Sequence, residues 1–161
     1  MRVLRISGLV LMVLFLVIGI SYAQTAVEYH KKGVEYGAQG EFKEAEKEFK
    51  KALKIDQFFT PAKECLKLIE EVLEERVESE AAIHLFKGVA YGSKGMFDEE
   101  IAEYKKAIAI NPNLAEAHYN LAVAYYYKGQ HGLAIEPCDR AIELGYKAQP
   151  ELLEALKPYR K

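Results

Sequence analysis

The sequence predicts an all-α protein made of repeated helical hairpins. Residues 88–110 match residues 122–144 at seven positions, each pair 34 residues apart, as from Gly88 to Ala122. Residues 33–55 match residues 88–110 at the same seven positions. In each copy, apolar residues recur every three or four positions before and after a central turn, which is the pattern of two amphipathic helices. A repeat of this length indicates a stack of helix-turn-helix units.

The first 23 residues are predicted to be a targeting segment and not part of the fold. Arg2 and Arg5 precede a long apolar run, and the small residues Ser21 and Ala23 follow it. This order is typical of a secretory signal peptide, with cleavage after Ala23. The alternative is a membrane anchor over residues 6–22, because about twenty mostly apolar residues span a bilayer. Both interpretations predict an exported protein, either periplasmic or secreted, or held at the membrane.

The first hairpin is expected over residues 24–59. Tyr29, Gly33 and Tyr36 lie three or four residues apart and so share one face of a helix. Gly40 ends that helix, and a second helix follows with a buried stripe. This stripe consists of Ala45, Phe49, Ala52 and Leu53.

Residues 60–80 are an insertion between the first two copies, and they carry their own amphipathic helix beginning at Pro61. One interpretation is that this helix caps the first hairpin and that the chain bends near Glu78, Ser79 and Glu80. The other is a single long helix from Thr60 to Gly88, because no Gly or Pro lies between Pro61 and Gly88. Such a rod would favour exchange of the first hairpin between two chains and hence a homodimer.

The second and third hairpins are expected over residues 81–114 and 115–148. Pro112 cannot continue a helix and therefore marks the end of the second copy. After Gly145, residues 149–161 are predicted to form a short helix from Pro150 that caps the exposed end of the stack.

The repeats resemble the tetratricopeptide repeat. The resemblance is carried by Gly, Tyr, Gly, an aromatic residue, Ala and Pro at the offsets seen at Gly88, Tyr91, Gly95, Tyr104, Ala107 and Pro112. It implies a three-repeat solenoid, here with one inserted helix and a C-terminal capping helix. The sequence departs from the family pattern by placing Tyr29, His84 and His118 where Trp is usual, and Glu100 where Ala is usual.

The resemblance also implies a concave groove that binds a protein or peptide partner. By family position, the first helix of each repeat lines it, and the candidate partner-binding residues are His30, Val34, Leu85, Val89, Tyr119, Val123, Tyr126 and Tyr127. Tyr119 and Tyr126 are predicted to hold an apolar segment of the partner, since tyrosine is enriched at binding hot spots. The alternative is that the tyrosines belong to the core and that the C-terminal helix covers Tyr126 and Tyr127. One family variant grips a C-terminal carboxylate through polar groove residues, and Val34 and Val123 at those positions argue against it.

Composition and motifs exclude several other functions. Without residues 1–23 the chain has 22 − 2 = 20 basic and 24 acidic residues and no basic stripe, which argues against nucleic acid or anionic lipid as ligand. No phosphate-binding loop, serine elbow or paired-carboxylate motif is present, so we expect no enzyme activity and no cofactor. The histidines His30, His84, His118 and His131 are spread over the three repeats, which argues against a metal site.

Cys65 and Cys138 are predicted to be two separate buried thiols, with a disulfide between them as the alternative in an exported protein. The sequence therefore predicts an exported interaction module that scaffolds a complex. A chaperone-like holder or accessory subunit for exported clients is the alternative function.

Overall fold

The computed structural model describes residues 25–160, and every regular element in that range is a helix. This confirms the predicted all-α repeat fold. The predicted signal peptide or anchor, residues 1–23, lies outside the described residues. Within residues 25–160, no helix is both long enough and apolar enough to cross a membrane.

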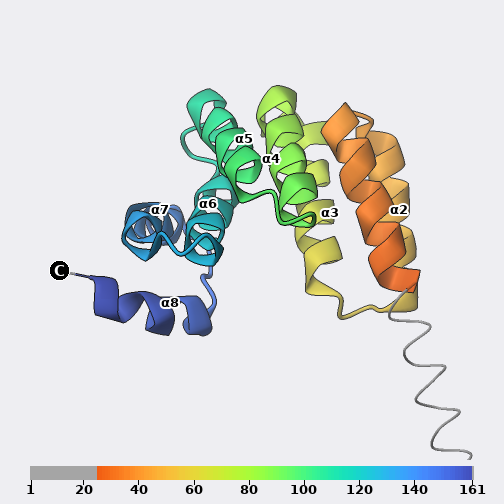
Figure 1. Cartoon of the computed structure of the whole chain (residues 1–161). Helices are drawn as coiled ribbons and strands as arrows, with labels where there is room; N and C mark the ends of the chain where they lie inside the picture. The colour runs from red at the N-terminus through yellow and green to blue at the C-terminus, as the bar shows by residue number, and fades with distance from the viewer. Residues whose placement is uncertain (1–24, 161) are drawn as a thin grey trace, which may run out of the picture.

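The helices form hairpins that follow one another along an arc (Figure 1). The helix of residues 25–39 pairs with α2 (Phe42–Ile55), α4 (Ser79–Gly92) with α5 (Phe97–Ile110), and α6 (Ala115–Tyr127) with α7 (His131–Glu143). The inserted helix α3 (Thr60–Leu73) packs mainly against α2. The short helix α8 (Pro150–Leu156) and the 3-10 helix η1 (Lys157–Tyr159) close the other end against α7.

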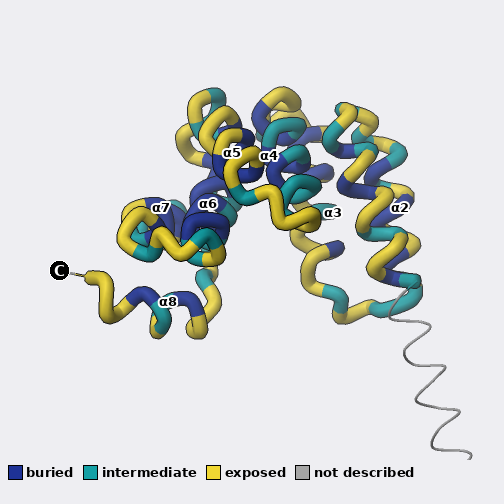
Figure 2. Tube along the Cα trace, viewed as in Figure 1, coloured by how far each residue is buried: buried dark blue, intermediate teal, exposed yellow. Residues whose placement is uncertain are grey.

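In each of the first two hairpins, an aromatic side chain of the second helix packs directly against a glycine of the first. A Cβ atom at Gly33 would lie 2.5 Å from Cε1 of Phe49, and one at Gly88 would lie 2.3 Å from Cε1 of Tyr104. The helices approach closely at these points because no side chain intervenes. The buried positions accordingly lie where neighbouring helices face one another (Figure 2).

Five helices end in the same hydrogen-bonded turn. At Gly40, Gly95, Gly129 and Gly145 the φ angle is between 71° and 88°, and the next residue's N–H donates to the carbonyl five residues before it. This is the Schellman motif, in which glycine is usual because its φ can be positive without steric cost. The fifth turn follows α3, and there Glu75 takes the place of glycine with φ of 57°. Its hydrogen bonds are the same: Arg76 N–H donates to the Glu71 carbonyl and Glu75 N–H to that of Val72.

The alternative of one continuous helix from Thr60 to Gly88 is therefore wrong. α3 ends at Leu73 and α4 begins at Ser79, with the turn at residues 74–78 between them. The absence of Gly and Pro gave no signal for this end, because Glu75 adopts the left-handed conformation that glycine provides in the other four turns.

The turn at residues 74–78 divides the structure into an N-terminal unit, residues 25–73, and a C-terminal unit, residues 79–160. Phe86 of α4 joins them: its ring, fully buried, contacts Gly37 and lies 6.0 Å from the Phe49 ring. On the polar side, Lys67 Nζ lies 3.7 Å from Glu116 Oε1.

Candidate functional site

An apolar groove of about 300 Å³ lies between the helix of residues 25–39 and α4. Val34 forms part of its buried floor at 3% exposure, whereas Val27 at its edge is 52% exposed. Three charged side chains also line it, Lys31 and Glu35 of the first helix and Lys94 of the turn that follows α4. The complete lining is Val27, His30, Lys31, Val34, Glu35, Val89, Ala90, Ser93 and Lys94. The groove is thus shared between the N-terminal and C-terminal units.

A smaller cavity of about 170 Å³ shares His30 and Val89 with the groove. One wall is Leu85, and α3 supplies another through Cys65 and Leu68. The inserted helix therefore forms part of the surface that the sequence assigned to the first helices of the repeats alone.

His30 is a packing residue at this junction. Burial lowers the pKa of its imidazole, which favours the neutral ring. The ring lies 5.4 Å from that of Phe59 and 5.6 Å from that of Phe49, and its Nε2 is 3.6 Å from Sγ of Cys65. The arrangement suits an apolar contact surface more than proton transfer.

The four candidate residues of the third repeat line neither cavity. Tyr119 is 7% exposed and stacks on Tyr146, with ring centroids 4.5 Å apart. Tyr126 packs edge-on against His131 at 5.0 Å, and Val123 is half-buried. Tyr127 is 68% exposed. The structure thus brings together His30, Val34, Leu85 and Val89, and it places Tyr119, Val123, Tyr126 and Tyr127 elsewhere.

The burial of Tyr119 depends on a residue that sequence reasoning did not single out. Tyr146 follows the last Schellman glycine, Gly145, which turns the chain back toward α6. Burial, together with the nearby carboxylates Glu64 and Glu116, raises the pKa of the Tyr146 hydroxyl. The only sequence signal for this contact was Gly145 as a helix terminator.

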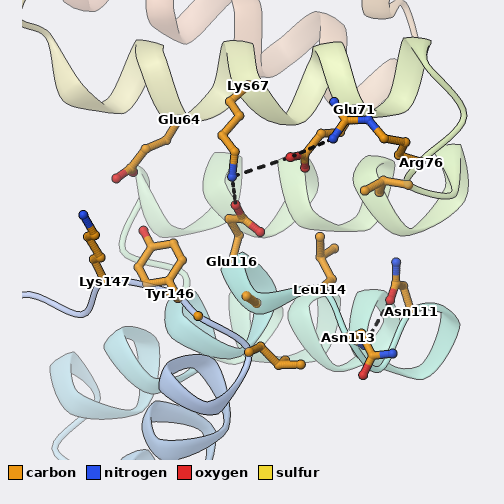
Figure 3. Close-up of a pocket in the computed structure, with 14 residues that line it drawn as sticks. Glu64, Lys67, Glu71, Arg76, Asn111, Asn113, Leu114, Glu116, Tyr146 and Lys147 are labelled. Carbon is orange, nitrogen blue, oxygen red and sulfur yellow. Dashed lines mark hydrogen bonds and ion pairs between the residues drawn. The ribbon is translucent and has the colours of Figure 1, made fainter.

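A polar cavity of about 550 Å³ lies between α3, the start of α6 and the turn at residues 144–147. Figure 3 shows Lys67 between Glu71 and Glu116, at 3.5 and 3.7 Å respectively. Arg76 is also ion-paired, with Glu71 and Glu74. The charges of Lys67, Glu71, Arg76 and Glu116 in this cavity are thus paired with one another or with Glu74.

Both cysteines are free thiols in this structure. Burial, followed by the nearby Glu64 carboxylate, raises the pKa of the Cys65 thiol to about 12, and burial also raises that of Cys138. Since the thiolate is the reactive form, neither sulfur is activated as a nucleophile.

Comparison with known families identifies the repeats. Residues 29–59 and 115–144 match models of the tetratricopeptide repeat, and residues 88–129 match a TPR repeat model. The chain therefore contains tetratricopeptide repeats, which are protein-interaction modules.

The chain is 37% identical over 76 residues to the Hsp70-Hsp90 organising protein of Plasmodium falciparum (isolate 3D7), a match that covers 47% of this chain and 14% of that protein. Among solved structures, it resembles the first TPR of Spaghetti (RPAP3) bound to the HSP90 peptide SRMEEVD, at 18% identity and a TM-score of 0.46, covering 85% of this chain and 91% of that one. A structure of MamA is 19% identical, with a TM-score of 0.41, covering 80% of this chain and 96% of that one.

Proposed function

We propose that this protein is an exported protein-interaction module that binds an apolar segment of a partner polypeptide in the groove between the helix of residues 25–39 and α4. The observation that carries the proposal is the apolar lining of that groove, with exposed Val27 at its edge, half-buried Val89 within it and buried Val34 at its floor. Large apolar side chains near a surface cavity are typical of binding sites.

The similarity to the Hsp70-Hsp90 organising protein supports a protein partner, because the name of that relative refers to the organisation of other proteins. The groove itself favours an apolar segment over an acidic C-terminus. Val34 stands where the carboxylate-gripping variant of the family needs a polar residue. Lys31 and Lys94 are accompanied by Glu35, so the lining is not uniformly basic.

The test compares one groove variant with one matched control. Val27→Asp introduces a charge at an exposed groove position, and Leu133→Asp introduces the same charge at an exposed position of α7, where Leu133 is 56% exposed. Each is used as bait in native extract, and bound proteins are identified by mass spectrometry and then measured individually by calorimetry.

We expect a partner that binds the wild-type chain and Leu133→Asp with equal affinity and Val27→Asp at least tenfold more weakly, since a buried unpaired charge is costly. Equal binding to all three proteins would place the site away from the groove. Loss of binding in Leu133→Asp alone would place it on α7.

Export has its own test. The intact mass of protein recovered from expressing cells, together with N-terminal sequencing, is expected to show a chain that begins at Gln24 and lies outside the cytoplasm. An unprocessed chain in the membrane fraction would favour the anchor over residues 6–22. An unprocessed chain in the cytoplasm would contradict both forms of export.

A further inference from the structure

We propose that the chain forms a domain-swapped dimer, in which the turn at residues 74–78 straightens and the N-terminal unit of each copy packs on the C-terminal unit of the other. The partner is a second copy of this chain, and the interface is the one that joins the two units within the monomer.

The turn at residues 74–78 is the weakest of the five Schellman turns. Glu75 is the only residue other than glycine with a positive φ in residues 25–160. A side chain in this conformation brings Cβ close to the following carbonyl oxygen, and this strain disappears when the residue becomes helical.

When α3 and α4 join, the turn gives up the ion pairs of Arg76 with Glu71 and Glu74 and the packing of Val77. The N-cap residue of α4, Glu78, makes no side-chain hydrogen bond to the helix end. Glu74, Glu75 and Arg76 are good helix formers, and each residue added to a helix gains an intrahelical hydrogen bond. The bond from Asn111 Nδ2 to Glu78 Oε2, 2.8 Å long, links the last residue of the turn to the C-terminal unit.

The contacts between the units do not depend on which chain supplies them. Three contacts cross the boundary between residues 25–73 and residues 79–160. They are Phe86 with Gly37, Ile83 with Gly40, and Lys67 with Glu116. A second copy offers the same surface with the same complementarity, so a swapped dimer regains every one of these contacts. Strained hinges are the known condition for such exchange.

The first experiment changes only the hinge. The full-length wild-type chain, Glu75→Gly and Glu75→Val are purified, and mass in solution is measured by light scattering over a wide concentration range. Glycine relieves the strain in the turn, whereas a β-branched residue increases it. We expect Glu75→Gly to weaken dimerisation on the order of tenfold or more, because each dimer straightens two hinges, and Glu75→Val to strengthen it.

Circular dichroism verifies that each variant is helical, and the comparison between wild type and Glu75→Gly is sufficient if Glu75→Val does not fold. A dimer held by the apolar segment in residues 1–23 would not respond to residue 75. The proposal would be overturned if wild type, Glu75→Gly and Glu75→Val were all monomeric at every concentration, or if all three dimerised equally.

The second experiment distinguishes exchange from side-by-side association. Lys67→Glu and Glu116→Lys each place two like charges together within a monomer or a homodimer. In a swapped heterodimer of the two variants, both interfaces regain opposite charges. After mixing and partial unfolding, native mass spectrometry is expected to show heterodimer above the half predicted for random pairing. Random pairing or no mixed dimer would contradict exchange of the N-terminal unit.

Discussion

At the scale of single residues, packing in the hairpins depends on a pairing of small and large side chains. Gly33 faces Phe49, and Gly88 faces Tyr104. At the same place in the third repeat stand Ala122 and Cys138, both fully buried. The larger residue on one helix accompanies the smaller one on the other, so the volume of the pair changes less than that of the Phe49, Tyr104 or Cys138 position alone.

Gly88→Ala is expected to lower the free energy of unfolding by about 1–3 kcal/mol, because the new methyl group would overlap the Tyr104 ring. Gly132→Ala in α7 is the control, since nothing lies within 4 Å of a Cβ atom there, and it should be neutral or slightly stabilising. Urea unfolding measures both. Equal effects of the two substitutions would contradict the proposed role of the close contact.

Glu100 is expected to make stability fall as pH rises. Burial raises the pKa of its carboxyl to about 7, although a hydrogen bond from Tyr104 acts in the opposite direction. Because the folded-state pKa exceeds the ordinary value of 4.5, the stabilising protonated form is complete below about pH 4.5 and is lost as pH rises toward 7. Glu100→Gln should therefore gain stability over wild type between pH 5 and pH 8, by up to about 3 kcal/mol.

Glu103→Gln is the matched control for this measurement, and the sign should be reversed. Burial raises the pKa of Glu103, but hydrogen bonds from Lys106 and His84 outweigh it, so that the net pKa is lowered. The ionised form of Glu103 is thus stabilising above its ordinary pKa, and the variant should be less stable than wild type near neutral pH. Urea unfolding at several pH values measures both variants. If the free energy of unfolding changed in the same direction for both, relative to wild type, these assignments would be contradicted.

At the scale of elements, the five Schellman turns differ mainly in one residue. Glu75→Gly should raise the free energy of unfolding of the dilute monomer by about 0.5–1 kcal/mol, because glycine adopts positive φ without strain. The reverse change at a sister turn, Gly95→Glu, should lower it by a similar amount. Nothing lies within 4 Å of a Cβ atom at Gly95, so its effect is conformational and not steric. Thermal unfolding measures the stability of both variants. A change in the same direction for both, relative to wild type, would contradict this account.

The elements also show how far the sequence could predict the structure. The hairpins followed from periodicity and from Gly40, Gly95, Gly129 and Gly145, since these residues act locally. A bend after the inserted helix was predicted near Glu78, Ser79 and Glu80, but α3 ends earlier, at Leu73, because Glu75 has no intrinsic preference for a turn and gave no local signal. Tyr119 had the spacing of a groove residue, but its burial depends on Tyr146 from a distant part of the chain. Periodicity assigns a face to a residue and does not predict what covers that face.

At the scale of the whole molecule, the fully buried ring of Phe86 joins the two units. Phe86→Ala should destabilise the molecule by about 3–5 kcal/mol and weaken docking of the N-terminal unit. Hydrogen exchange should then accelerate in residues 25–73 more than in residues 115–148.

Leu156→Ala in α8 is the control for Phe86→Ala, because Leu156 is fully buried at the opposite end of the stack. Its exchange pattern should be reversed, with faster exchange in residues 131–160 and protection kept in residues 25–73. Uniform acceleration in both variants would mean that the repeats unfold as one cooperative block and not through neighbour contacts.

The position of the groove on the boundary between the two units has a consequence for valency. Val34 comes from one unit and Val89 from the other, so a swapped dimer would contain two complete grooves, each built from both chains. A ligand with a single binding segment gains equally from a groove in either form and cannot shift the balance between them. A ligand that carries two such segments can occupy both grooves of a dimer at once, and its avidity would then select the dimer.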